Sequence, residues 1–356
     1  MVPTLNATLV LEDGTKFYGK SFGYPKSTSG EVVFNTAMTG YPESLTDPSN
    51  EGQILVTTYP ILGNYGVPPL TEKNGISEHF ESNIVHVRAV VAQDYTENFS
   101  HWQAERSLSA WLNEAQITGI YGIDTRALTK HLRDNGTMLG KIIIDGSAEP
   151  EWYNPNSENL ISKVSCTQVE EYGCGDKTVV VVDCGVMHNI IRNLVACGVK
   201  VIRVPWDYDF TQLTYDGICI SNGPGNPEFA CATIENIKKA IQQNKPICGI
   251  CLGNQLLGLA AGAKTVKLPY GHRSHNQPVR KVGTDSCYIT SQNHGYVLDA
   301  NTIPEDWEPL FVNMNDGTIE GIRHKSKPFM SAQFHPGASE DTSFNVLLLN
   351  DFIKML

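Results

Sequence analysis

Residues 246–257 of the chain read Pro246-Ile247-Cys248-Gly249-Ile250-Cys251-Leu252-Gly253-Asn254-Gln255-Leu256-Leu257. This pattern predicts a short buried strand, a tight turn and a helix that runs from Leu252 to about Gly262. Gly249 and Gly253 flank Cys251 at the spacing of a nucleophile elbow, where a Cβ would crowd the sharp turn. The elbow would point the sulfur into the crevice at the carboxyl end of the sheet, and the helix N-terminus would favour its thiolate. We therefore predict that Cys251 is a nucleophile and that another part of the chain supplies its base.

Two other roles for Cys251 stay open on these residues alone. The first is a buried structural thiol, the common state of a cytosolic cysteine. The second follows from the C-x-x-C formed with Cys248, which is found in redox pairs and in halves of zinc sites. A zinc site needs about two more ligands, and the sequence has no second C-x-x-C and no H-x₃₋₅-H unit. We expect no metal site, and we expect Cys248 to be buried within its strand.

His335 is the candidate base. It follows a predicted strand over residues 329–334 and precedes Pro336, which restricts the preceding residue to extended conformations. A strand end would place His335 at the edge of the sheet where Cys251 emerges. His294, in the stretch 292–295 (Gln-Asn-His-Gly), is the main competitor among the ten histidines.

A third candidate element is the loop Ser221-Asn222-Gly223-Pro224-Gly225-Asn226-Pro227, which directly follows an apolar strand. It matches neither G-x-G-x-x-G nor a Walker loop, which argues against a nucleotide-phosphate site. Two glycines around a proline predict a rigid loop whose backbone N–H groups, with that of Leu252, could bind an oxyanion. A plain turn is the alternative.

Size and composition limit the classes of protein. A chain of 356 residues suits two domains, and 41% hydrophobic with 18% charged residues is typical of a globular protein. The formal net charge of −11 argues against nucleic acid as a partner, because phosphate binding needs a basic face. No apolar run approaches the ~20 residues that span a bilayer, so we expect no membrane partner. The N-terminus lacks the layout of a signal peptide, and the nine scattered cysteines fit reduced thiols, so we expect a cytoplasmic protein.

The pattern of elements predicts two domains of different class. Residues 1–148 are expected to form an α+β domain, with a hairpin at Asp13-Gly14, a strand over 84–91, a helix that begins at Ser100 and a second helix capped by Asp124. Residues 149–176 are rich in Gly, Ser, Pro, Asn and Glu and are interpreted as a linker. Residues 177–356 alternate strands and helices, which predicts a doubly wound, mostly parallel α/β sheet with an amphipathic helix at about 344–356.

Taken together, the glycine loop, the Gly-Ile-Cys-Leu-Gly elbow and the late His-Pro resemble the class I (triad-type) glutamine amidotransferases, which implies a flavodoxin-like fold for 177–356. The N-terminal half resembles the small, glutaminase chain of the carbamoyl phosphate synthetase family, so the likeness covers essentially the whole chain. The amino-acid sequence is most similar to the eukaryotic form, in which this region is fused to the synthetase. The matching stretches are Leu11-Glu12-Asp13-Gly14, Gly30-Glu31-Val32-Val33-Phe34, Gly40-Tyr41-Pro42-Glu43, Leu45-Thr46-Asp47-Pro48-Ser49, Gly63-Asn64-Tyr65-Gly66 and Asp124-Thr125-Arg126.

This resemblance implies a mechanism and a set of site residues. Cys251 would attack the side-chain amide of L-glutamine and His335 would shuttle the proton, forming a γ-glutamyl thioester that water hydrolyses. The ammonia would pass to a synthetase, as a separate large chain or as fused domains, that makes carbamoyl phosphate. ATP and Mg²⁺ would bind only there, so no cofactor is expected in this chain. The implied glutamine contacts are Ser49, Gly223, Gly225, Leu252, Gln255, Asn293, Gly295 and Tyr296, and Ser49 would place the site at the domain interface.

The chain also departs from the family pattern. The family triad ends in Glu two residues after the histidine, where this chain has Gly337, and the nearest acid is Glu340. Without that carboxylate the imidazole would be less well oriented, and catalysis would be weakened. Asn254 stands where His is usual, and Met187 where Lys is usual. Two readings therefore compete: a working glutaminase, or a weakened or inactive regulatory module of the synthetase. A cysteine peptidase of related fold is a third, but the N-terminal half has no role in it.

Overall fold

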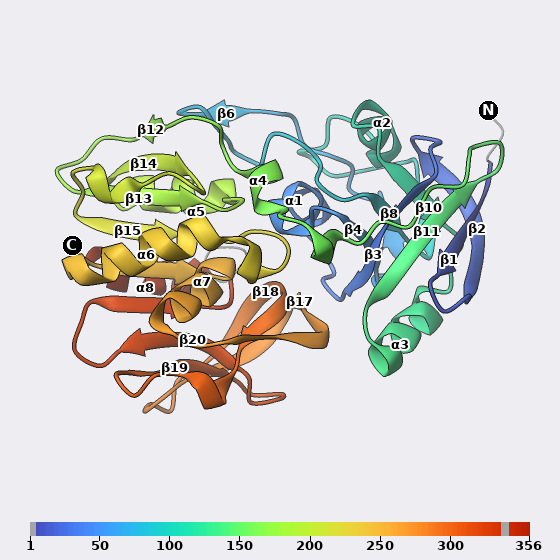
Figure 1. Cartoon of the computed structure of the whole chain (residues 1–356). Helices are drawn as coiled ribbons and strands as arrows, with labels where there is room; N and C mark the ends of the chain where they lie inside the picture. Colours follow the sequence, from blue (N-terminus) through green and yellow to red (C-terminus); the bar gives the residue numbers. More distant parts are fainter. Residues whose placement is uncertain (1–4, 336–341) are drawn as a thin grey trace. The chain divides into compact units, whose positions relative to one another are not determined.

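The computed structural model describes residues 5–335 and 342–356 (Figure 1). The chain divides into two compact units. The first comprises Met1–Lys73 and Ser77–Glu158, and the second comprises Asn74–Ile76 and Asn159–Leu356. The main break therefore falls within the segment 149–176.

The first unit is built around a closed barrel of seven strands in the order β1-β11-β3-β4-β8-β10-β2. Its interior is apolar and includes Leu9, Ile54 and Ile142, all fully buried. The hairpin predicted at Asp13-Gly14 is confirmed, since β1 and β2 pair antiparallel on either side of it. Closure leaves no unpaired strand edge, a feature that the α+β prediction did not contain. The strands are β1 (Asn6–Leu11), β2 (Lys16–Gly23), β3 (Thr28–Asn35), β4 (Gln53–Thr57), β8 (Ala89–Val91), β10 (Thr118–Tyr121) and β11 (Met138–Ile144).

The helices of this unit confirm one predicted start and correct another. Asp124 caps its helix, with Oδ1 accepting from the Ala127 N–H at 2.8 Å. The helix predicted from Ser100 instead begins at Leu108, behind a Ser107 cap. The prediction assigned Trp102 to the buried face of this helix, but Trp102 is 84% exposed and lies on no buried helix face. The strand predicted over 84–91 is only β8. The remaining elements are α1 (Tyr41–Thr46), η1 (Pro48–Asn50), α2 (Leu108–Glu114), α3 (Thr125–Asn135), and the two-residue strands β5 (Ile61–Leu62), β6 (Glu72–Lys73), β7 (Ile76–Ser77) and β9 (Asp94–Tyr95).

The second unit holds one sheet of ten strands in the order β12-β14-β13-β15-β16-β21-β20-β19-β17-β18. The five strands from β14 to β21 are parallel, which confirms the doubly wound prediction. The strands are β12 (Glu170–Tyr172), β13 (Thr178–Asp183), β14 (Lys200–Pro205), β15 (Gly217–Ile220), β16 (Ile247–Ile250), β17 (Thr265–Lys281), β18 (Cys287–Leu298), β19 (Trp307–Asn313), β20 (Ile319–His324) and β21 (Phe329–Ala332).

Helices cover both faces of the parallel strands (Figure 1). Val179 and Val181 of β13 pack into one apolar cluster with α5 and α8, whereas Val180 and Val182 pack into a second cluster with α6 and α7. A strand buried on both faces explains the continuous apolar run in this part of the sequence. The helices are α4 (Ile161–Val164), α5 (His188–Ala196), α6 (Cys231–Gln243), α7 (Leu252–Ala261), α8 (Thr342–Ile353), and the short turns η3 (Phe210–Gln212), η4 (Pro227–Phe229) and η5 (Ala300–Thr302).

Two parts of this unit differ from the sequence predictions. The segment 149–176 contains the short turn η2 (Pro155–Ser157), which falls in the first unit, and α4 and the edge strand β12, which fall in the second. Strand β12 pairs antiparallel with β14. The antiparallel extension β17–β20 was predicted only at residues 288–290. Its buried faces carry polar side chains, such as Arg273, Ser291 and Gln292, so it lacks the apolar alternation that marks a strand.

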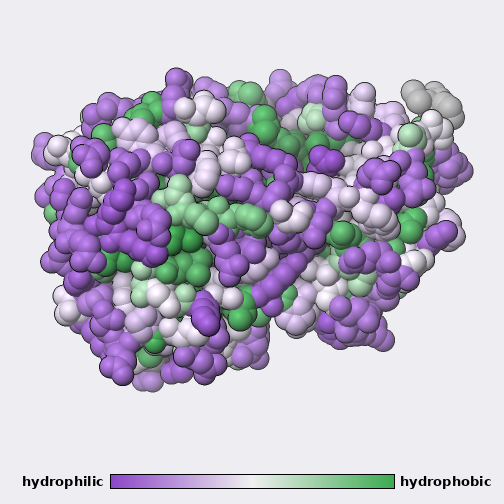
Figure 2. All heavy atoms as spheres, viewed as in Figure 1, coloured by the Kyte–Doolittle hydropathy of each residue, from purple (hydrophilic) through white to green (hydrophobic). Residues whose placement is uncertain are grey.

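Polar side chains cover most of the face seen in Figure 2, with smaller apolar areas between them. Among residues 5–335 and 342–356, no helix is long and apolar enough to cross a membrane.

Candidate active site

Cys251 occupies a strained turn between β16 and α7. Its backbone has φ 54° and ψ −103°, a conformation that residues other than glycine rarely adopt. A Cβ on Gly249 would lie 2.4 Å from the Gly253 carbonyl oxygen, and one on Gly253 would lie 2.1 Å from that of Ile220. Both glycines are therefore required by close backbone approach. Strain of this kind costs ~1–3 kcal/mol and clusters at functional positions.

The Cys251 sulfur lies between the end of β21 and the middle of β18. The Cys251 N–H donates to Ala332 O at 2.8 Å, which fixes the elbow against β21. The side-chain amide of Gln333, the next residue along, donates to Sγ at 3.6 Å. Sγ also lies 3.7 Å from Asn293 O, a distance at which a thiol can donate to the carbonyl. Cys251 is 2% exposed, so its contacts are made out of bulk water.

Gln333 is held in place by two further amides. Its Oε1 accepts from Asn254 Nδ2 at 2.9 Å and from Gln255 Nε2 at 3.2 Å. Asn254 Oδ1 in turn accepts from the Ser331 hydroxyl at 2.8 Å. With Oε1 engaged in this way, the Gln333 amide nitrogen is directed at the sulfur. Sequence reasoning missed Gln333, although its position two residues before the candidate base on a strand end was a usable signal.

His335 follows β21 and is bound to the same strand that contacts Cys251. The backbone N–H of His335 donates to Ser291 O at 2.9 Å. Ser291 and Asn293 are two residues apart on β18, which corresponds to roughly 7 Å along a strand. The candidate nucleophile and the candidate base therefore contact one short stretch of backbone.

The ring of His335 contacts Met187, which stands at the start of α5. His335 Nδ1 lies 3.1 Å from Met187 Sδ, and the Met187 N–H donates to Asn222 Oδ1 at 3.0 Å. A thioether is a weak acceptor, so Nδ1–H can donate to it and leave the Nε2 lone pair for proton transfer. Gly337 and Glu340 lie outside the described residues.

The glycine loop lies beside the elbow, next to the side chain of Leu252. A Cβ on Gly223 would come within 2.0 Å of Cys184 O and 2.8 Å of the Leu252 side chain. Gly225 has φ 82°, a backbone conformation that favours glycine. A Cβ on this residue would lie 3.4 Å from Cδ1 of Leu160. The oxyanion role of this loop stays a prediction.

The other predicted glutamine contacts are placed on two elements of the second unit and one of the first. Asn293, Gly295 and Tyr296 lie on β18, and Gln255 on α7 donates from Nε2 to Tyr296 O at 2.8 Å. Ser49 lies in η1 of the first unit, with its N–H donating to Asp47 Oδ1 at 2.9 Å. Its place in a shared site stays a prediction.

The competing residues are less suited to the chemistry. Cys248 is fully buried, and burial raises the pKa of its thiol to about 12, which disfavours a redox pair with Cys251. His294 is buried too, and burial together with the charge of His272 holds the pKa of its ring well below the usual value. Its Nδ1 and Nε2 lie 3.0 Å from Tyr296 O and 3.1 Å from Gln292 Oε1, respectively.

Comparison with known proteins matches both halves of the chain. Residues 9–142 match the model of the carbamoyl-phosphate synthase small chain, CPSase domain, and residues 180–355 match that of class-I glutamine amidotransferases. Human mitochondrial "Carbamoyl-phosphate synthase [ammonia]" is 48% identical over 360 residues, 100% of this chain and 24% of the relative. "Multifunctional protein CAD" of Squalus acanthias is 50% identical over 336 residues, 93% of this chain and 15% of the relative. "Multifunctional protein pyr-3" of Neurospora crassa is 45% identical over 382 residues, 97% and 21% of the two.

The chain thus spans less than a quarter of the length of these curated relatives. Both matched models agree with the two units of the structure, one barrel-based and one doubly wound. The chain belongs to the carbamoyl-phosphate synthase small-chain family, with a class-I glutamine amidotransferase domain as its second half.

Proposed function

We propose that this chain hydrolyses L-glutamine as the glutaminase part of a carbamoyl-phosphate synthase. The observation that carries the proposal is the strained Cys251 elbow, with an amide donor at its sulfur and His335 bound to the same stretch of β18. A nucleophile in a strained turn, beside a base and a helix N-terminus, is the arrangement that amide hydrolysis through a thioester requires.

The steps follow from these groups. His335 Nε2 takes the thiol proton, and Sγ of Cys251 attacks the amide carbon of glutamine. The tetrahedral oxyanion would be bound by backbone N–H groups of Leu252 and the Gly223–Gly225 loop. The His335 imidazolium then gives its proton to the leaving nitrogen, so ammonia departs and a γ-glutamyl thioester remains. Water attacks the thioester with His335 as base, and glutamate and the free thiol are released.

Met187 takes the place beside His335 Nδ1 that a carboxylate would occupy in a triad. The thioether can orient the ring by accepting the Nδ1–H, but it cannot neutralise the imidazolium as a carboxylate does. We therefore expect a working glutaminase with a low turnover. The Gln333 amide compensates in part, because it donates to the sulfur as the thiolate forms.

The ammonia would be delivered to synthetase domains, fused or separate, that form carbamoyl phosphate, in keeping with the relatives' names and greater length. ATP and Mg²⁺ belong to those domains in this proposal, and no cofactor is assigned to this chain. A cytoplasmic location also stays a proposal, since some relatives are named mitochondrial.

Incubation of the protein with glutamine tests the proposal. Glutamate should accumulate, and mass spectrometry after an acid quench should find a glutamyl adduct on the Cys251 peptide. Cys251→Ala should abolish both, whereas Cys231→Ala, at an exposed cysteine, should leave both unchanged. If the wild-type protein with its synthetase releases no glutamate above the Cys251→Ala background, the regulatory-module alternative replaces this proposal.

A further inference from the structure

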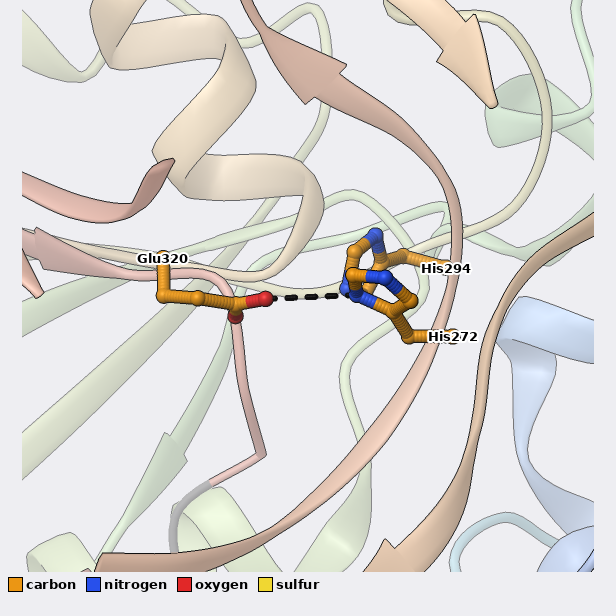
Figure 3. Close-up of side chains that lie close together, drawn as sticks. All are labelled: His272, His294 and Glu320. Atoms are coloured by element: carbon orange, nitrogen blue, oxygen red, sulfur yellow. Dashed lines mark ion pairs between the residues drawn. The ribbon is translucent and has the colours of Figure 1, made fainter. Parts of the chain in front are cut away.

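Three buried side chains outside the proposed chemistry converge in the antiparallel part of the second unit (Figure 3). They are His272 of β17, His294 of β18 and Glu320 of β20, and each places one ligand atom within 4.8 Å of the other two. Glu320 reaches toward both imidazoles in Figure 3, and the two rings meet edge to face with centroids 5.0 Å apart. Glu320 Oε1 lies 3.2 Å from His272 Nδ1.

Partners on the outer side orient each of these groups. His272 Nε2 donates to Asp316 Oδ2 at 2.9 Å, and His294 Nδ1 donates to Tyr296 O at 3.0 Å. Asn313 Nδ2 donates to Glu320 Oε1 at 3.0 Å. With both rings neutral, this arrangement would leave the lone pairs of His272 Nδ1 and His294 Nε2 on the inner side. A bound cation would then replace any proton held between His272 Nδ1 and Glu320 Oε1, which lie 3.2 Å apart. Histidines that bind metals have this arrangement, with the second ring nitrogen bound to a carboxylate or a backbone carbonyl.

Two buried polar atoms of this cluster lack a hydrogen-bond donor among the described residues. They are one ring nitrogen of His294 and Oε2 of Glu320. His294 Nε2 faces Gln292 Oε1 at 3.1 Å and His294 Nδ1 faces Tyr296 O at 3.0 Å, so both ring nitrogens lie against oxygen atoms although a neutral ring carries one proton. Gln292 is not free to turn its amide, because its Nε2 donates to Thr290 Oγ1 at 3.1 Å. An imidazole lone pair therefore points at an oxygen.

The second such atom is on Glu320. Glu320 is fully buried, and among the described residues its Oε2 has no hydrogen-bond partner. A buried carboxylate oxygen without a donor carries a desolvation penalty, which a bound cation would offset.

We propose that His272, His294 and Glu320 bind one divalent transition-metal ion of the zinc class, with Gln292 Oε1 as the fourth donor. Two nitrogens and two oxygens suit Zn²⁺, whose tetrahedral bond lengths separate neighbouring ligand atoms by roughly 3.4 Å. The His272–Glu320 and His294–Gln292 atom pairs, at 3.2 Å and 3.1 Å, are already close to that separation. Rotation of the side chains must close the remaining separations, which among His272, His294 and Glu320 are within 4.8 Å.

Such an ion would tie together β17, β18 and β20. His294 lies between Asn293 and Gly295, so the metal would stiffen the strand that supports the Cys251 site without touching the reacting atoms. Sequence spacing could not reveal this set, since its members come from three strands and share no short motif.

Cobalt(II) is the probe of choice, because it reports geometry and ligand type by its absorption. The full chain, treated with EDTA and dialysed, should take up one equivalent of Co²⁺ with the intense visible bands of a tetrahedral site and without a sulfur-to-cobalt charge-transfer band. Zn²⁺ should displace it and raise the melting temperature. His272→Asn and Glu320→Gln should abolish the visible bands.

Asp316→Asn keeps the proposal testable if the buried variants fail to fold, since Asp316 is partly exposed. It should weaken Co²⁺ binding about tenfold to a hundredfold through the loss of an outer partner. His131→Asn is the matched control, because His131 makes a similar pair with Asp13 at 2.6 Å in the barrel unit, and it should bind Co²⁺ like the wild type. The proposal is overturned if no stoichiometric tetrahedral spectrum forms, if the spectrum shows cysteine charge transfer and survives His272→Asn, or if Asp316→Asn binds like the control.

Discussion

Replacing Gln333 with leucine should raise the pKa of Cys251. In the structure the Gln333 amide donates to Sγ at 3.6 Å, and it stabilises the thiolate more than the thiol. Hydrogen bonds to charged groups contribute about 1.5–3 kcal/mol, and one pKa unit corresponds to about 1.4 kcal/mol. The pKa should therefore rise, and the thiolate population near neutral pH should fall at least about tenfold.

The rate of alkylation by iodoacetamide as a function of pH measures this shift, with mass spectrometry to separate Cys251 from the other eight cysteines. Leucine also removes the acceptor of Asn254 Nδ2, which should cost about 1–3 kcal/mol of unfolding free energy. Ser331→Ala is the matched control, since it removes a buried hydrogen bond to Asn254 from the same network without touching the sulfur. It should lower stability and leave the pKa of Cys251 unchanged. An unchanged pH–rate profile in a folded Gln333→Leu protein would refute the role given to this amide.

Three further predictions follow from the site and its surroundings. Met187→Leu removes the acceptor of His335 Nδ1 while keeping the volume, and it should lower kcat about twofold to tenfold with little change in KM, as glutamate release would show. An unchanged kcat would mean that the thioether does not orient the ring. Gly253→Ala places a Cβ 2.1 Å from Ile220 O and should lower the denaturation midpoint more than Gly146→Ala, whose Cβ meets open space and adds only the backbone strain of φ 84°; equal losses would contradict the crowding argument. Because burial raises the pKa of Cys248 to about 12, its thiol should stay protonated and unreactive near neutral pH while exposed Cys231 is alkylated; rapid labelling of Cys248 in the folded protein would contradict its burial.

The elements that the sequence predicted well are those with a strong local cause. The elbow at Cys251 needs two glycines at fixed spacing, and β13 is apolar on both faces, so each leaves a clear pattern in the sequence. The helix predicted from Ser100 failed because Trp102 suggested a buried face that does not exist.

Other features depend on pairings that are distant in the chain. Barrel closure joins β1 to both β2 and β11, and no local pattern marks the second of these contacts. The amide chain to Gln333 and the contact of Met187 with His335 likewise join residues about 80 and 148 positions apart. Their polar side chains resemble surface residues when read one at a time, so only the folded arrangement identifies them.

The backbone at Cys251 has a consequence for how this position can change over time. Its dihedral angles are ones that glycine adopts freely, so a cysteine there holds the fold at lower stability than a glycine would. Drift without selection for glutamine hydrolysis would favour loss of the side chain and a gain in stability. A cysteine in so unfavourable a backbone is what selection for its sulfur would produce.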